Sequence, residues 1–181
     1  MVSDVIVRDT VEADFPAIQA IYAQEVLHGL ASFEEVPPTI DDLKGRFAKI
    51  VKDGFPFLSA ELDGRVVGYS YASSFRPRIA YRYSVENSVY VAADMQGNGI
   101  GRSLLSALIE RCEEGPWRQM IAVIGDTGNA GSIALHEKLG FHHCGTLHNT
   151  GFKLGRWVDT VLMQRALGPG ADTLAEGNDR Q

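Results

Sequence analysis

Residues 89–112 read VYVAADMQGNGIGRSLLSALIERC. This stretch begins as an apolar, β-branched run typical of a strand and ends with apolar residues at helical spacing. Between the two lie three alternating glycines, Gly97, Gly99 and Gly101. Glycine adopts positive φ at no steric cost, and the free N–H groups of a helix N-terminus attract anions. The stretch therefore predicts a strand, a phosphate-binding turn and a helix in succession.

Two common phosphate-binding loops do not fit this turn. A Walker loop requires a lysine, and the stretch contains none. The dinucleotide fingerprint G-x-G-x-x-G/A fails in both registers, because Arg102 or Leu104 takes its third position. What remains is Gln96-x-x-Gly99-x-Gly101, followed by the positive charge of Arg102. The alternative is a plain strand-to-helix turn, which rarely requires three alternating glycines.

Hydrophobic periodicity predicts the order β-α-α-β-β-β-α-β-α-β-β for the whole chain. The predicted elements are strand 2–7, helix 14–27, a helix capped by Thr39 and Asp42 and stopped by Gly54, a hairpin over 55–75 that turns at Asp63–Gly64, strand 84–91, a helix ending near Glu113, strand 119–125, helix 130–140, and strands 141–148 and 157–167. This is a mixed α/β layout rather than a doubly wound sheet. We expect one domain over residues 1–167, and a disordered tail over 168–181, which has too few apolar residues to pack.

The bulk composition argues against several classes of function. The 181-residue chain has a formal net charge of -6, whereas a nucleic-acid-binding protein needs a basic face. Cys112 and Cys144 lie in no metal-binding or C-x-x-C spacing, so we expect no metal and two reduced thiols of a cytoplasmic protein. We recognise neither a signal peptide nor an apolar run approaching the ~20 residues of a membrane span.

Several segments, in the right order, resemble the GNAT acyltransferase superfamily. VYVAADMQGNGIGRSLL is similar to its acyl-CoA pyrophosphate loop, Q/R-x-x-G-x-G/A, and NAGSIALHEKLGF to its asparagine-containing helix. More narrowly, ASFEE, RPRIAYRYSVENSVYV, HEKLGF and GFKLGRWVDTVLMQ resemble the phosphinothricin and methionine sulfone or sulfoximine acetyltransferases. The resemblance covers about Val7 to Leu167. It implies the GNAT α/β fold, a mixed central sheet with flanking helices that is splayed at the acyl-CoA site.

The resemblance also implies a set of acetyl-CoA contacts. The backbone of the strand before the loop would pair with the pantetheine arm, and the loop would bind the pyrophosphate. Asn129 matches a cofactor contact of the family, although an asparagine here also suits a helix N-cap. Lys138 would approach the cofactor from the same helix; the alternative is a lysine that is simply exposed to solvent. The implied cofactor residues are Val89, Tyr90, Val91, Gln96, Gly97, Asn98, Gly99, Ile100, Gly101, Arg102, Asn129, Ser132 and Lys138.

Two residues are candidates for proton transfer. Glu86 interrupts the apolar alternation of strand 84–91, and partial burial would raise the pKa of its carboxyl toward that of a useful base. The resemblance places the catalytic glutamate here; the alternative is an exposed strand residue. His136 occupies the helix position where many superfamily members carry a tyrosine general acid. It would donate a proton to the leaving thiolate or, alternatively, pack against the substrate.

The acceptor pocket is expected around FRPRIAYRYSVENS. A guanidinium matches a carboxylate or phosphinate bidentately, and aromatic rings would enclose a compact side chain. The alternative is an ordinary solvated basic loop. The expected substrate-binding residues are Phe33, Arg76, Arg78, Tyr81, Tyr83, Glu86, Asn87 and Ser88.

The sequence therefore predicts an N-acetyltransferase that moves an acetyl group from acetyl-CoA directly to a small amino acid or analogue. Phosphinothricin, methionine sulfone and methionine sulfoximine are the expected acceptors. We expect neither a nucleic acid nor a membrane as a partner. We expect a homodimer, in which the segment GFKLGRWVDT closes the shared active site. The alternatives are an acetyltransferase for a polyamine or a peptide N-terminus, and a non-catalytic CoA-binding sensor.

Overall fold

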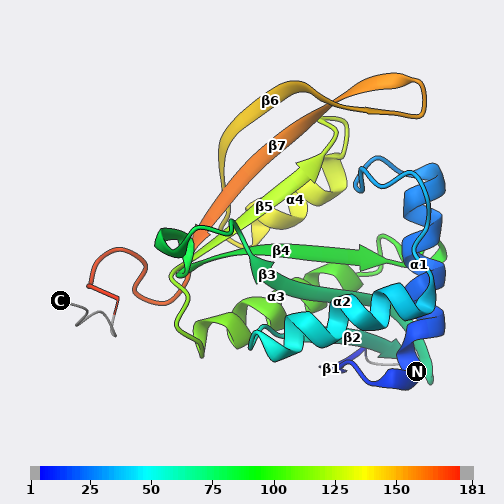
Figure 1. Ribbon diagram of the computed structural model, residues 1–181, viewed down its shortest axis with the longest axis horizontal. Coiled ribbons are helices and arrows are strands. Elements are labelled where there is room, and N and C mark those ends of the chain that lie inside the picture. The colour runs from blue at the N-terminus through cyan, green and yellow to red at the C-terminus, as the bar shows by residue number, and fades with distance from the viewer. Residues whose placement is uncertain (1–4, 176–181) are drawn as a thin grey trace.

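A computed structural model describes residues 5–175, and its order of elements is the predicted one (Figure 1). Short 3-10 turns precede α1, β4 and α3. The helices and strands are β1 (Ile6–Asp9), α1 (Phe15–His28), α2 (Ile40–Lys52), β2 (Phe57–Leu62), β3 (Arg65–Ser74), β4 (Ser84–Val91), α3 (Ile100–Glu113), β5 (Gln119–Gly125), α4 (Ala130–Lys138), β6 (His142–Lys153) and β7 (Arg156–Ala166).

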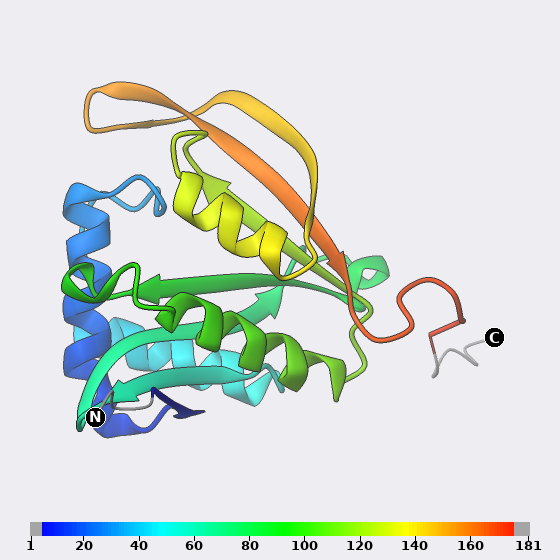
Figure 2. The same cartoon turned by 180° about the vertical axis from the view of Figure 1, so that it is seen from behind.

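The strands form one sheet in the order β1-β2-β3-β4-β5-β7-β6. Among the described strands β4 and β5 run parallel, and the other neighbours pair antiparallel. Helix α2 covers one face of the sheet, while α3 and α4 cover the other, as comparison of Figures 1 and 2 shows. The predicted mixed α/β sheet with flanking helices is confirmed.

The central strands separate halfway along their length. Residues 84–87 of β4 pair with residues 119–122 of β5, and the pairing stops there. Beyond that point β4 continues to Val91 bonded to β3, and β5 continues to Gly125 bonded to β7. The two strands visibly diverge in Figures 1 and 2. The sheet is therefore splayed at its centre, as expected, and leaves one edge of β4 without a strand beside it.

The core lies on both faces of this sheet. On one face, apolar side chains of α3 such as Leu105 and Leu108 pack against Val85 and Met120. On the other, α1 and α2 cover an aromatic cluster that includes Phe57 and Tyr69, whose rings stack at 5.9 Å. Both clusters brace β4, so the splayed centre of the sheet has rigid surroundings.

The first strand and the last hairpin differ from their predicted bounds. Strand 1 was expected over 2–7; β1 spans Ile6–Asp9, and residues 1–4 lie outside the described part of the chain. β6 runs to Lys153, five residues beyond the predicted end, and forms a long hairpin with β7. Hydrophobic periodicity did not detect the extension, because residues 149–153 lack apolar alternation and the pairing with β7 shifts register between Leu147 and Gly151.

Residues 168–173 of the expected tail form turns and bends, and the Arg118 guanidinium donates to the carbonyls of Gly170 and Leu174 and to the hydroxyl of Thr173. Residues 176–181 of the expected tail lie outside the described part. Within residues 5–175 no helix has the length and apolar character needed to span a membrane.

Candidate active site

A cavity of about 420 Å³ lies where β4 and β5 separate. It is walled by α1, the α1–α2 loop, β3, β4, β5, the start of α4 and β7. Its lining residues are Tyr22, Ala31, Ser32, Phe33, Glu34, Tyr71, Glu86, Asn87, Ser88, Val89, Tyr90, Ala122, Val123, Ile124, Gly125, Asn129, Ser132, His136 and Thr160. The splay thus gathers residues from both halves of the chain around one space.

Glu86 points into this cavity from β4. Successive strand residues face opposite sides of the sheet, so Glu86, Ser88 and Tyr90 share one face and Val85 and Asn87 take the other. Burial raises the pKa of the Glu86 carboxyl, and the positive charge of Arg76 opposes that rise. A half-buried carboxylate with a raised pKa accepts a proton more readily than an exposed one, as a general base must.

His136 enters the cavity from α4 and lies against Asn87. Its Nε2 atom is 3.0 Å from Asn87 Oδ1, and its Nδ1 atom is 2.8 Å from the Ser132 carbonyl oxygen. Burial lowers the pKa of His136, and the bond to the Ser132 carbonyl raises it. Asn87 was expected to bind substrate, but its amide also donates to the Ile121 carbonyl at 3.1 Å. Both ends of that amide are therefore occupied by protein groups.

The glycine loop presents an open backbone, as anion binding requires. Gly97 and Gly99 have φ values of 78° and 81°, and a Cβ built at either would meet no atom within 4 Å. Gly99 is the N-cap of α3, whose first N–H groups are free of intrahelical partners. Arg102 is exposed beside it, whereas the Ile100 side chain is fully buried and anchors the loop in the core. These features suit the pyrophosphate of acetyl-CoA.

Of the other expected cofactor residues, some line the cavity and others do not. The Asn98 amide donates to the carbonyls of Met95 and Gln96, so this side chain stabilises the loop itself. Asn129 caps α4 by accepting from the Ser132 N–H at 3.2 Å, and both residues line the cavity. Lys138 is exposed at the far end of α4 and does not line the cavity.

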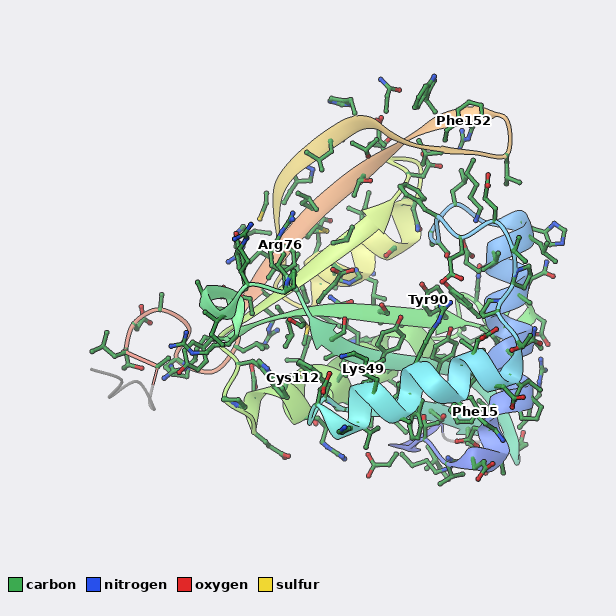
Figure 3. All side chains as sticks on the ribbon, in the orientation of Figure 1. Phe15, Lys49, Arg76, Tyr90, Cys112 and Phe152 are labelled. Carbon is green, nitrogen blue, oxygen red and sulfur yellow. The ribbon has the colours of Figure 1, made fainter. Side chains whose placement is uncertain are left out.

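The expected acceptor residues divide into two groups. Phe33, Glu86, Asn87 and Ser88 line the cavity, whereas Arg76, Arg78, Tyr81 and Tyr83 do not. The Arg76 guanidinium lies 5.1 Å from the centre of the Phe75 ring, and the Arg82 guanidinium lies 4.5 Å from that of Tyr83. Figure 3 shows Arg76 and Tyr90 toward opposite ends of β4. The paired arginine clamp is therefore not assembled in the cavity of this single chain.

A hydrogen-bonded network that the sequence did not predict forms the wall made by α1 and the α1–α2 loop. The Tyr22 hydroxyl lies 2.8 Å from Ser32 Oγ and donates to Glu34 Oε1 at 2.9 Å. Arg46 of α2 holds the same Glu34 carboxylate with two bonds, at 2.6 and 3.1 Å. Tyr71 of β3 also lines the cavity. The motif ASFEE marked this loop, but nothing in the sequence connects it to Tyr22 or Arg46.

Lys153 of β6 stabilises the same wall, although it lies far from the α1–α2 loop in the sequence. Its side chain is only 2% exposed, and its ammonium donates to the carbonyls of Ser32 and Glu25. Burial lowers the pKa of Lys153, and nearby glutamates such as Glu34 oppose that shift. Because 121 residues separate Lys153 from Ser32, no local pattern predicts the contact.

Two glycines allow this loop to approach the sheet. A Cβ at Gly125 would lie 2.1 Å from the Leu30 carbonyl oxygen, and one at Gly151 would lie 2.5 Å from the Phe33 ring. The end of β5 and the β6–β7 hairpin therefore both touch the α1–α2 loop. The cavity wall is fixed by close backbone packing as well as by hydrogen bonds.

The comparison with known families agrees with this geometry. The family model described as the acetyltransferase (GNAT) domain matches residues 7–162. The chain belongs to the GNAT acetyltransferase family.

Similar proteins include named phosphinothricin and methionine sulfoximine/sulfone acetyltransferases. The chain is 55% identical over 171 residues to the phosphinothricin N-acetyltransferase of Alcaligenes faecalis, covering 94% of this chain and 85% of that protein. It is 40% identical over 164 residues to an L-methionine sulfoximine/L-methionine sulfone acetyltransferase of Pseudomonas aeruginosa, covering 90% and 95%. A crystal structure of a phosphinothricin acetyltransferase from Sinorhizobium meliloti in complex with AcCoA superimposes with a TM-score of 0.93, at 46% identity over 98% and 95% of the two chains.

Proposed function

We propose that this GNAT protein acetylates the amine of a small amino acid or analogue with acetyl-CoA, the acceptor being phosphinothricin, methionine sulfone or methionine sulfoximine. The observation that carries the proposal is the cavity at the splay, which has Glu86 on one wall and His136 on another. The relatives named above support the acceptor class.

Acetyl-CoA supplies an acetyl group activated as a thioester. The N–H groups at the start of α3, with Arg102 beside them, would hold its pyrophosphate. The edge of β4 from Ser88 to Val91, which has no strand beside it, offers backbone groups for the pantetheine arm. Asn129 and Ser132 would complete this side of the site from α4.

Glu86 would take the proton that the acceptor ammonium must lose before its nitrogen can attack. The raised pKa of this carboxyl suits the task. His136 would return a proton to the departing thiolate from the opposite wall. Neither step requires an acyl-enzyme, and the buried Cys112 of α3 packs in the core, away from the cavity lining.

The charge pattern favours an α-amino acid over a polyamine. The positive charge of Arg76 is near enough to Glu86 to oppose the rise of its pKa. An α-amino acid carries a carboxylate on the same carbon as its amine, so an acceptor whose amine reaches Glu86 brings a negative charge into the positive potential of Arg76, although that guanidinium lies outside the cavity lining. A polyamine has no anion to satisfy that guanidinium.

We also infer a homodimer in the cytoplasm, with residues 1–167 as its acetyltransferase domain. The β6–β7 hairpin exposes Phe152, Leu154 and Trp157, and a partner chain would cover these side chains. Light scattering should give twice the 19.8 kDa chain mass, and Trp157→Asp should shift the protein toward the monomer. A wild-type protein that stays monomeric at micromolar concentration contradicts the dimer.

A thiol-release assay with a panel of amines tests the function. The panel comprises phosphinothricin, methionine sulfone, methionine sulfoximine, their methyl esters, spermidine and a peptide. We expect the free acids to exceed the esters at least tenfold in kcat/KM, because charged hydrogen bonds contribute ~1.5–3 kcal/mol each. Equal rates for acid and ester would point to another amine, and no turnover with any amine would favour a CoA-binding sensor.

A further inference from the structure

A chain of polar contacts lies along the cavity wall and joins β5, β4 and α4. Asn87 of β4 donates from Nδ2 to the Ile121 carbonyl at 3.1 Å. Its Oδ1 atom lies 3.0 Å from Nε2 of His136, whose Nδ1 atom lies 2.8 Å from the Ser132 carbonyl. Asn87 and His136 are 7% and 4% exposed. The chain thus begins and ends at backbone carbonyls and lies almost wholly out of solvent.

The number of hydrogens in this chain does not match a neutral histidine. Three contacts must each hold one hydrogen, and both terminal groups are carbonyls that can only accept. A neutral imidazole and one asparagine amide place just two hydrogens along the line. Turning the amide over, or exchanging the imidazole tautomer, moves the unfilled contact without removing it. A second ring proton on His136 fills all three.

Burial opposes that second proton: it lowers the pKa of His136 below its ordinary value, and the Ser132 carbonyl offsets only part of this effect. Glu86 of β4 lines the same cavity, and β5 contributes no titratable side chain. Glu137 and Lys138 of α4 and His142 of β6 are exposed. The Ser132 hydroxyl, at 3.5 Å from Nδ1, is the competing partner for a neutral ring and is more distant than the carbonyl.

We propose that Asn87 is a positioning residue that holds a second proton on buried His136 by completing this three-bond chain. Asn87 then acts on the proton donor rather than on the acceptor substrate. The proposal deepens the proposed function: on breakage of the carbon–sulfur bond, the Nε2 or Nδ1 proton passes to the thiolate, and neutral imidazole remains. The acceptor ammonium loses two protons on becoming an amide: Glu86 takes the first before attack, and the second, released from the nitrogen after attack, restores the imidazolium.

Nuclear magnetic resonance of histidine labelled with ¹⁵N in the ring tests the proposal on the protein without acetyl-CoA. At about pH 6, both nitrogens of His136 should be protonated in the wild type. Asn87→Leu keeps the volume but removes the acceptor, so the pKa of His136 should fall by about one to two units. Asn87→Asp keeps the shape and adds a negative charge, so the same pKa should rise. Exposed His148, paired with Asp159 of β7, is the internal control, and its ring signals should not change.

A kinetic readout separates positioning from a merely structural effect. Because the protonated ring is the active form, the alkaline fall of kcat should move to lower pH in Asn87→Leu and to higher pH in Asn87→Asp. A His136 ring with one proton at pH 6, or an unchanged His136 pKa in Asn87→Leu, overturns the proposal. If Asn87→Leu does not fold, the protonation state of His136 in the wild type and the change of its pKa in Asn87→Asp test the proposal instead. If the protein proves not to be an acetyltransferase, the resonance experiment still tests whether Asn87 holds the second proton on His136.

Discussion

The Glu86 carboxyl lies in surroundings that favour its protonated form. Burial raises its pKa in the folded chain above the value in the unfolded chain. A carboxyl of this kind contributes stability below the unfolded pKa and loses that contribution as the pH rises through the folded pKa. At neutral pH the ionised group therefore lowers the stability of the fold. This cost is expected where a site is arranged for catalysis.

Replacing Glu86 by glutamine should separate stability from activity. Glu86→Gln keeps the volume but cannot take a proton, so turnover at pH 7 should fall ~10²–10⁴-fold. The free energy of unfolding at pH 7 should rise above that of the wild type, and the difference should vanish below about pH 4, where the wild-type carboxyl is protonated. Thiol release and thermal unfolding across pH measure both effects. Wild-type turnover at pH 7 would exclude Glu86 as the base.

Gly99 has a positive φ and lies at the proposed phosphate site. A second glycine with a positive φ but no such site allows the effect of backbone strain to be separated from the effect on CoA binding. Gly64 in the β2–β3 turn has φ 77°, and a Cβ there also meets nothing within 4 Å. Gly99→Val and Gly64→Val should therefore lose similar stability, of order 1–2 kcal/mol, from backbone strain. Only Gly99→Val should weaken CoA affinity, which calorimetry measures, because its side chain covers the N-terminus of α3. Equal CoA affinity in the two folded variants would remove the phosphate site from this loop.

The long strand β6 is the element that connects the hairpin to the acceptor wall. It contacts the α1–α2 loop through Gly151 and Lys153, while its other glycine, Gly145, has open space around it. The extension of β6 past its predicted end is what brings these residues to the cavity. Its contribution to activity is therefore expected to be one of shape rather than chemistry.

Two matched substitutions in β6 test this role. A methyl group at Gly151 would lie 2.5 Å from the Phe33 ring, so Gly151→Ala must displace that ring from the cavity wall. The KM for the amino-acid acceptor should rise several-fold, while the KM for acetyl-CoA should not change. Gly145→Ala, where nothing lies within 4 Å, should leave both constants unaltered. A wild-type acceptor KM in Gly151→Ala would show that Phe33 does not shape the acceptor site.

The whole chain should gain stability from acetyl-CoA, because the site exists only where the two halves of the sheet meet. Residues of β4, β5 and α4 converge there, so unfolding destroys the site entirely. Ligand at 100 times its dissociation constant should add about 2.7 kcal/mol, a rise in Tm of roughly 5–10 °C for a chain of this size. Differential scanning calorimetry with and without acetyl-CoA measures it. Gly99→Val should show a smaller rise, and no rise in the wild type would contradict binding at the splay.

Local chemistry alone determined several features of this protein. Thr39 and Asp42 form the predicted capping box, with bonds of 2.9 and 3.1 Å between backbone and side chains. The Asp63–Gly64 turn and the glycine loop likewise follow from residues whose steric limits act within a few positions. The order of elements followed from periodicity for the same reason. Each of these features depends on neighbours in the chain.

Only the tertiary structure decided which of these residues meet. Asn87 and His136 are 49 positions apart, and Lys153 and Ser32 are 121 apart, so no spacing rule relates them. The same packing leaves Arg76 and Arg78 outside the cavity lining and brings Arg118 within hydrogen-bonding distance of Gly170 and Leu174. Side-chain pairing across the sheet depends on where β4 and β5 part and on how far β6 extends. The point of separation and the length of β6 both result from the packing of the whole core, so short stretches of sequence do not determine them.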